Sequence, residues 1–320
     1  MTERTALIAI GGNALMPAGG YSVAAQRKRM AETATRIAGL VADGWRVVLT
    51  HGNGPQVGAA LLRSERAADQ AYALPLDACV ASTQGEMGFL LEEALSGALA
   101  ERRLATELAT VVTRVRVSTD DAAFRHPTKP VGPFYSDEEA AVQRSQGWAL
   151  VEQPPRGYRR VVASPEPLDI PEERVIRTLQ RTGVLVIALG GGGVPVARCG
   201  SRLMGVEAVV DKDLSSALLA TRLEVELFLV LTDVDGIYLD FGTPTARRLT
   251  YVGAAELREH ARAGHFPAGS MGPKAEAVLR FVEAGGPHAI VTSPERMEQA
   301  IHGDDGTHAL GEGSWSASAR

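Results

Sequence analysis

The sequence is poor in lysine, asparagine and cysteine, and it contains no long hydrophobic run. The two cysteines, Cys79 and Cys199, form no CxxC pair and lie in contexts that predict burial, which is typical of a reducing compartment. No segment reaches the ~18 apolar residues of a membrane span. The N-terminal MTERTALIAIGGN also lacks the longer apolar stretch of a signal peptide. We therefore expect a cytoplasmic protein with no membrane segment.

An excess of charge of one sign is also missing. The 33 basic and 38 acidic residues give a net charge of −5, with no long run of either sign. This balance excludes a general electrostatic attraction for nucleic acid or for an anionic membrane. The 320 residues are 45% apolar, with a mean hydropathy of −0.02, as expected of a soluble globular protein built as one large α/β domain or two smaller ones. Any bound anion must therefore be held by local groups.

Only four of the 33 basic residues are lysines, and three of these four lie in short motifs rich in Gly, Pro or Asp. They are Lys129 in PTKPVGP, Lys212 in VDKDL and Lys274 in GSMGPK. A chain that otherwise uses Arg keeps Lys where a compact ammonium on a flexible stem cannot be replaced by a planar fork. The fourth, Lys28, is typical of a solvated helix face. The three motif lysines predict a site for a highly charged anion.

Short apolar runs that end in glycine loops and precede helical patterns recur along the chain. They lie at residues 6–10, 45–50, 184–189 and 225–236. Runs that are apolar at every position are typical of strands buried on both faces of a parallel sheet. Residues 22–43 have helical spacing, with Ser22 as the N-cap and Gly44 as the stop signal. The pattern predicts a three-layer α/β architecture with ligand sites at the carboxyl ends of the strands.

One stretch breaks this pattern. Residues 119–165 are rich in Pro, Arg and aromatic residues around one helical segment at 136–145, and we interpret them as a small inserted subdomain, similar to a lid. Residues 1–310 otherwise form a single domain in this interpretation. The last residues, 311–320, are expected to be a disordered tail.

Both asparagines of the sequence lie in glycine loops that follow apolar runs, at Asn13 in IGGNAL and Asn53 in HGNGPQVG. A third such loop is the GGGG at residues 190–193. Glycines at these positions let backbone N–H groups approach a ligand beside the positive end of a helix. Each loop alone is equally typical of a tight turn, but three at equivalent strand ends favour an anion cradle. None of them matches the P-loop or the dinucleotide-binding GxGxxG pattern.

The acids around Lys212 and the position of Lys274 are the next chemical signals. Asp211 and Asp213 flank Lys212 just before a helical run. Such carboxylates hold an ammonium protonated and aim it, although aspartates that cap a helix give the same pattern. Lys274 falls in the first turn of a predicted helix, where a cation opposes the helix dipole unless an anion binds there.

The remaining candidates are more ambiguous. Asp233 and Asp235, at a strand end in LTDVDGIYL, are typical either of an Asx-type turn or of contacts to Mg²⁺ or nucleotide. Lys129, between two prolines, fits a lid residue and a solvated lysine equally well. His51 has no nucleophile-like partner, and we expect it to order its loop. Lysines, glycine loops and aspartates without a nucleophile, a base dyad or a Cys/His cluster indicate phosphoryl transfer.

Taken together, the motifs resemble those of the carbamate kinases, within the amino-acid kinase fold family. The segments that carry the resemblance extend in order over almost the whole chain: IAIGGNAL (8–15), THGNGPQVG (50–58), PTKPVGPFY (127–135), RRVVASPEP (159–167), GGGGVPV (190–196), GVEAVVDKDL (205–214), LTDVDGIYL (231–239) and GSMGPKAEAVLRFVE (269–283). This ordered series is far more specific than any single glycine loop.

The resemblance implies a fold, a reaction and an assembly. The fold is an α/β sandwich around a mostly parallel sheet of roughly eight strands, with a small protruding subdomain. The reaction is the reversible transfer of a phosphoryl group between ATP and carbamate, giving ADP and carbamoyl phosphate, with Mg²⁺ and with flux toward ATP. The implied assembly is a homodimer, without nucleic acid or membrane partners.

The resemblance also assigns roles by motif position, and no side chain is assigned as a direct metal ligand. The carbamoyl and transferring phosphoryl groups contact Gly11, Gly12, Asn13, Gly52, Asn53 and Gly54. The catalytic groups are Lys129, Lys212, Lys274 and Asp213, which orients lysines or metal. The nucleotide pocket is formed by Asp211, Thr232, Asp233, Tyr238, Met271 and Gly272.

Two other functions compete with this one. A kinase of the same fold can act on another small carboxylate or phosphate, although the PTKPVGP motif argues against it. A nucleotide-binding sensor without turnover is a different class, and retention of all three motif lysines argues against a sensor. We therefore expect a site between the two halves of the chain, because the glycine loops with asparagine come from the first half and Lys212 and Lys274 from the second.

Overall fold

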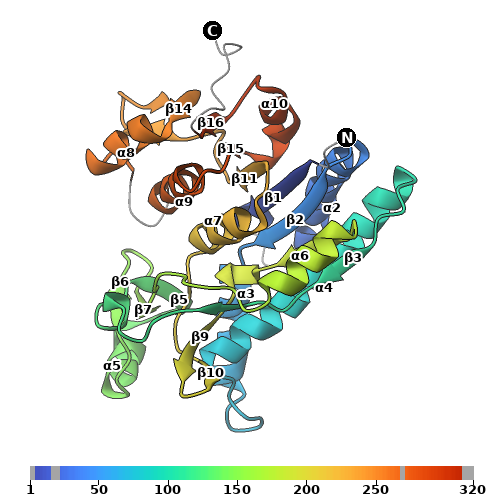
Figure 1. Cartoon of the computed structure of the whole chain (residues 1–320). Coiled ribbons are helices and arrows are strands. Elements are labelled where there is room, and N and C mark those ends of the chain that lie inside the picture. Colours follow the sequence, from blue (N-terminus) through green and yellow to red (C-terminus); the bar gives the residue numbers. More distant parts are fainter. Residues whose placement is uncertain (1–3, 16–21, 267–270, 312–320) are drawn as a thin grey trace.

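The structure is a computed structural model of the chain and describes residues 4–15, 22–266 and 271–311 (Figure 1). The predicted disordered tail, from residue 312 onward, lies outside the described residues, as do Gly269 and Ser270 of the GSMGPK motif. Within the described residues, no helix is both long enough and apolar enough to cross a membrane. Cys79 is buried as expected, but Cys199 is exposed, so the expectation of burial was wrong for this residue.

An eight-stranded sheet forms the centre of the molecule. Its strands, in spatial order, are β14 (Tyr251–Gly253), β16 (Thr307–Leu310), β15 (His288–Thr292), β11 (Leu227–Leu231), β1 (Thr5–Ile10), β2 (Arg46–His51), β8 (Leu185–Ala188) and β3 (Leu108–Thr110). All neighbours pair in parallel except β15 and β16. The predicted mostly parallel sheet is thus confirmed, and the four apolar runs correspond to β1, β2, β8 and β11.

Helices cover both faces of this sheet, as a three-layer sandwich requires (Figure 1). One face packs against α2 (Val23–Ala42), α4 (Leu76–Glu101) and α10 (Met297–His302). The other face packs against α6 (Glu173–Arg181), α7 (Lys212–Leu223) and α9 (Met271–Glu283). The alternation of side chains along each strand supplies both cores, which is why the strands read as continuous apolar runs.

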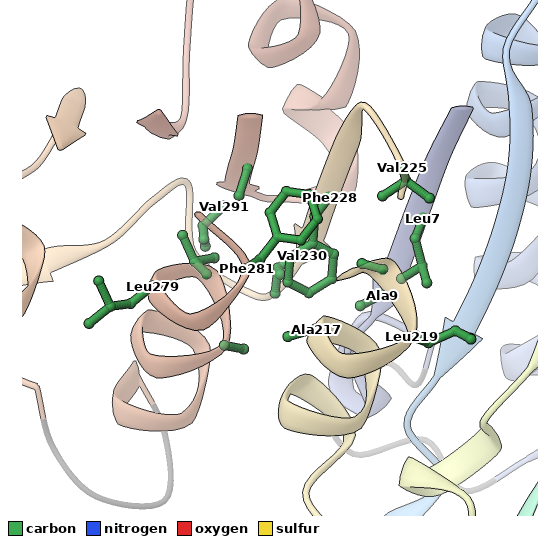
Figure 2. Packing of buried hydrophobic residues seen from close by; sticks show 14 of the residues in the cluster. Leu7, Ala9, Ala217, Leu219, Val225, Phe228, Val230, Leu279, Phe281 and Val291 are labelled. Atoms are coloured by element: carbon green, nitrogen blue, oxygen red, sulfur yellow. The ribbon is translucent and has the colours of Figure 1, made fainter. Parts of the chain in front are cut away.

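The core beneath α7 and α9 is centred on two phenylalanines (Figure 2). Phe228 of β11 and Phe281 of α9 are fully buried, with ring centroids 5.4 Å apart. Leu7 and Ala9 of β1 point to the same side, whereas Ile8 of β1 packs on the opposite face. This packing fixes α7 and α9 against the sheet, so the first residues of both helices have defined positions near the strand ends.

The helix predicted at residues 22–43 is α2, and its ends follow the sequence signals. The Ser22 hydroxyl caps it by accepting a hydrogen bond from the N–H of Ala25 at 3.2 Å. Gly44 adopts φ +84°, in the left-handed region that favours glycine after a helix.

A small sheet lies apart from the central one (Figure 1). Its three antiparallel strands have the order β5 (Lys129–Tyr135), β7 (Tyr158–Val162) and β6 (Leu150–Glu152). The helix expected at 136–145 is α5 (Asp137–Ser145), which begins with a capping box between Ser136 and Glu139. A mobile lid at this place stays a prediction.

The remaining elements are short or peripheral. They are α1 (Gly12–Leu15), α3 (Gly54–Arg66), α8 (Ala254–Arg262), β4 (Arg114–Arg116), β9 (Val194–Cys199), β10 (Arg202–Gly205), β12 (Tyr238–Leu239), β13 (Arg247–Arg248), and the 3-10 turns η1 (Ala122–Phe124), η2 (Gly190–Gly192) and η3 (Pro294–Arg296). Of these, α1 and α3 follow β1 and β2 directly, and both begin at the glycine loops.

Candidate active site

A cavity of about 500 Å³ lies where β1, β2 and β11 end. Thirteen of the residues predicted from the sequence line it: Gly11, Gly12, Gly52, Asn53, Gly54, Lys129, Asp211, Lys212, Asp213, Thr232, Asp233, Met271 and Lys274. They come from both halves of the chain and from the β5 strand of the small sheet. This gathering is what the carboxyl ends of parallel strands predict.

Three of the predicted site residues are not among these thirteen. The backbone of Asn13 lies in α1, but its side chain is outside the described part of the structure. Gly272 lies in the first turn of α9, between the lining residues Met271 and Pro273. Tyr238 is not in the cavity wall; it lies behind the wall, against Phe241.

The first two glycine loops pack directly on each other. A Cβ atom on Gly52 would lie 2.7 Å from the nitrogen of Gly12, a contact that main-chain atoms cannot relieve without moving. The N–H of Gly11 donates to Leu231 O at 2.8 Å, and the N–H of Gly52 donates to Ile10 O at 2.9 Å. These two N–H groups therefore extend the strand ladder, and the predicted cradle has to use donors other than these.

The third glycine loop differs from its predicted role as an anion cradle. All four residues of the loop at 190–193 are buried, and three have positive φ. A Cβ on Gly191 would lie 2.1 Å from the Oδ1 atom of Asn53, and one on Gly192 would lie 2.5 Å from Val210 O. The loop packs against the Asn53 side chain and against the main chain that leads to Lys212, and only its Gly191 lines the cavity.

The three motif lysines converge on two aspartates at the cavity. Lys212 Nζ lies 2.5 Å from Asp213 Oδ1, and Lys274 Nζ lies 3.3 Å from Asp213 Oδ2. Lys129 Nζ, from the small sheet, donates to Asp211 Oδ2 at 2.9 Å. Asp211 also caps α7, because its Oδ1 accepts the N–H of Asp213 at 2.9 Å. Both interpretations of the VDKDL motif, helix cap and lysine partner, therefore hold at once.

The charge state of Asp213 follows from its surroundings. Its residue is only 4% exposed, and burial alone would raise the pKa of the carboxyl. The ammonium groups of Lys212 and Lys274 outweigh burial and hold the pKa of Asp213 below its usual value. A buried carboxylate thus fixes two lysines at the cavity wall, and each ammonium carries three N–H donors.

His51 lies beneath the second glycine loop and is 1% exposed. Burial lowers its pKa to about 4, with a further contribution from the positive charge of Lys212. The ring is therefore neutral at neutral pH. Its Nδ1 lies 3.1 Å from Gly52 O, and since a carbonyl oxygen can only accept, Nδ1 is the donor in this contact. This contact fits the predicted role of His51 as a residue that orders its loop.

The cavity also contains residues that sequence reasoning missed. The most prominent is Phe241, a 51% exposed aromatic ring that contacts Tyr238 at a centroid distance of 5.5 Å. At the same wall, Thr232 Oγ1 donates to Asp233 Oδ1 at 3.0 Å. An aromatic residue in the polar stretch DFGTP, just after LTDVDGIYL, was the available signal for Phe241.

The acidic residues at the cavity bear on the Mg²⁺ that the resemblance implies. In the described ranges, no group of three or more His, Cys, Asp or Glu side chains is placed to hold a metal ion. Asp211 and Asp213 are present at the wall, already in contact with lysines. Mg²⁺ typically keeps several waters and binds through one or two carboxylates plus substrate phosphates. The donors present therefore fit a metal ion that arrives on phosphate groups.

Comparisons with known proteins agree with this arrangement. A sequence model of the Amino acid kinase family matches residues 4–293. The chain is 43% identical over 312 residues to the carbamate kinase of Thermococcus kodakarensis, covering 96% of this chain and 99% of that protein. It is 42% identical over 310 residues to the carbamate kinase-like protein YahI of Escherichia coli K12, covering 95% and 98%. Carbamate kinase from Giardia lamblia bound to AMP-PNP has a TM-score of 0.93 at 38% identity, covering 97% and 99%.

Proposed function

The chain belongs to the amino acid kinase family, and from this premise we propose that it works as a carbamate kinase. The reaction is the reversible transfer of a phosphoryl group between ATP and carbamate, with ADP and carbamoyl phosphate on the other side. The observation that carries the proposal is the convergence of Lys129, Lys212 and Lys274 on one cavity, each held by an aspartate.

Charge repulsion is the main obstacle in this reaction. A carbamate oxygen must approach the γ-phosphorus of ATP, and both partners are anions. Two like unit charges about 4 Å apart repel by about 4 kcal/mol at an effective dielectric constant of about 20. Three ammonium groups offset this repulsion and stabilise the charge on the phosphoryl oxygens in the transition state. Because Asp211 and Asp213 fix the lysines beforehand, little reorganisation is needed during the transfer.

The residues that line the cavity are of two chemical kinds. The glycine loops are small and suit the carbamoyl group, whereas Thr232, Met271 and Phe241 form a mixed apolar and polar surface that suits a nucleoside. The likeness to a carbamate kinase bound to AMP-PNP supports this assignment. We assign Mg²⁺ to the nucleotide phosphates beside Asp211 and Asp213, where it would neutralise negative charge.

Lys129 reaches the cavity from the small sheet, so movement of residues 119–165 as a lid would bring this cation onto the substrate and withdraw it. We also propose flux toward ATP, a homodimeric assembly and a cytoplasmic location. The specific competitor is a kinase for another small carboxylate or phosphate.

A panel of acyl phosphates tests the proposal. Purified protein receives ADP, Mg²⁺ and, in separate reactions, carbamoyl phosphate, acetyl phosphate or aspartyl phosphate, and ATP is measured by luminescence. We expect carbamoyl phosphate to give a kcat/KM at least about 100-fold above the others. Preference for another acyl phosphate would favour the competing kinase. ADP binding without ATP formation from any donor would favour a sensor.

A further inference from the structure

The loop that follows β11, residues 232–241, contacts an ionic network on the side that faces away from the cavity. In the two-stranded pair of β12 and β13, Arg248 lies directly opposite Tyr238. The Arg248 guanidinium donates to Asp235 Oδ2 at 2.8 Å, and the Tyr238 hydroxyl donates to Asp235 Oδ1 at 2.8 Å. Both carboxylate oxygens of Asp235 are therefore occupied. Arg248 thereby joins β13 to the turn at Asp235, and Arg296 Nη1 lies farther away, 4.0 Å from Asp235 Oδ2.

The same arginine ties this loop to the far end of the chain. Arg248 also binds the carboxylate of Asp305, which in turn contacts Arg296 at 2.5 Å and accepts the N–H of Gly306 at 2.8 Å. Burial would raise the pKa of Asp305, but these donors hold it at about 2, so the carboxylate is ionised at any working pH. The segment that bears Asp305 continues into β16, so Arg248 connects the loop to a strand of the central sheet.

The loop has little freedom to move relative to this network. The N–H of Ile237 donates to the hydroxyl of Thr307 at 2.8 Å. A Cβ on Gly236 would lie 2.7 Å from that hydroxyl and 3.0 Å from Arg248 Cδ. No space is therefore left for a larger side chain at Gly236 between the loop and the ionic network.

The front of the same loop forms one wall of the cavity. Thr232, Asp233, Val234 and Phe241 line it, whereas Arg248 and Asp305 do not. The Phe241 ring rests on Tyr238, whose hydroxyl is bound by Asp235. A continuous chain of contacts thus runs from Arg248 through Asp235 and Tyr238 to a ring in the cavity.

We propose that Arg248 is a positioning residue for the nucleotide: by bridging Asp235 and Asp305 it fixes the loop that binds the nucleoside end of ADP and ATP. That the ligand is a nucleotide rests on the proposed function. The phosphoryl end is held by lysines on other elements. Loss of Arg248 therefore weakens nucleotide binding and leaves the transfer step and the acyl phosphate site nearly intact.

The experiment compares Arg248→Gln with Arg247→Gln, a change of the exposed neighbouring arginine on the same strand. ADP binding is measured by titration calorimetry, and ATP formation is measured with ADP and carbamoyl phosphate varied separately. For Arg248→Gln we expect an ADP Kd and KM raised about tenfold or more. Its kcat at saturating ADP and its KM for carbamoyl phosphate should stay within about threefold of wild type. Arg247→Gln should match wild type.

A folded Arg248→Gln protein with wild-type ADP affinity would overturn the inference, as would a fall in kcat with ADP affinity unchanged. If Arg248→Gln does not fold, Tyr238→Phe replaces it, because this change removes only the hydroxyl that binds Asp235. It should raise the ADP Kd several-fold, and an unchanged Kd would again count against the inference. A wild-type protein that binds ADP but forms no ATP would contradict the proposed function and leave this inference standing.

Discussion

Replacement of Gly52 by alanine tests the close contact of the two glycine loops. The new Cβ would lie 2.7 Å from Gly12 N, whereas ordinary contacts begin at 3.4 Å, so the loops must separate by up to 0.7 Å. Overpacking of this kind costs about 1–3 kcal/mol of folding stability. A displacement of about 1 Å at a reacting centre costs about 100-fold in rate. We therefore expect kcat to fall about 10- to 100-fold, with stability reduced by about 2 kcal/mol.

The matched control is Gly85→Ala, at a helical position in α4 where a Cβ would meet nothing within 4 Å. It should leave kcat unchanged and add about 0.5–1 kcal/mol of stability, because alanine is the better helix former. Activity is measured as ATP formation and stability by guanidinium unfolding. Wild-type kcat in Gly52→Ala would show that the site forms without close contact of the two loops at this glycine.

Three other changes have defined outcomes. Asp213→Asn leaves two lysines without their buried carboxylate and should cost about 3–5 kcal/mol of stability at pH 7. The pKa of Asp213 is lowered in the folded state. The difference in unfolding free energy between wild type and Asp213→Asn should therefore become smaller as the pH falls below about 4. Burial lowers the pKa of His51 to about 4 in the folded protein. As the pH falls, the unfolded chain therefore binds a proton at this residue before the folded protein does, and the free energy of unfolding should fall from pH 6.5 toward 4. Between pH 7 and 5, the free energy of unfolding of His51→Gln should fall by about 2 kcal/mol less than that of wild type, as measured by urea unfolding. Phe241→Ala should raise the KM for ADP about tenfold in steady-state assays with kcat retained, because an aromatic ring stacked on a base contributes about 1–3 kcal/mol.

Much of the fold could be predicted because its signals are local. Apolar runs predicted the four strands, and Ser22 and Gly44 marked the ends of α2. The rule that ligands bind at the carboxyl ends of parallel strands then placed residues from distant motifs in one cavity. The scarcity of lysine identified the three cations there.

Other features depend on contacts between segments far apart in the chain. The packing role of the loop at 190–193 arises only because Gly191 meets the side chain of Asn53. Tyr238 and Phe241 differ in which of them faces the cavity, and this is decided by the hydrogen bond from Tyr238 to Asp235 and by the pairing of β12 with β13. No periodicity in the sequence encodes such pairings.

We propose that three lysines act as cations on the transferring phosphoryl group, and a series of conservative replacements tests this role most directly. ATP formation from ADP and carbamoyl phosphate is measured for wild type and for four variants: Lys129→Arg, Lys212→Arg, Lys274→Arg and Lys28→Arg. We expect turnover by wild type and by Lys28→Arg, and a loss of about 100-fold or more in each of the other three with the fold intact. Absence of ATP formation by wild type, or full activity with arginine at all three cavity positions, would contradict this role of the lysines.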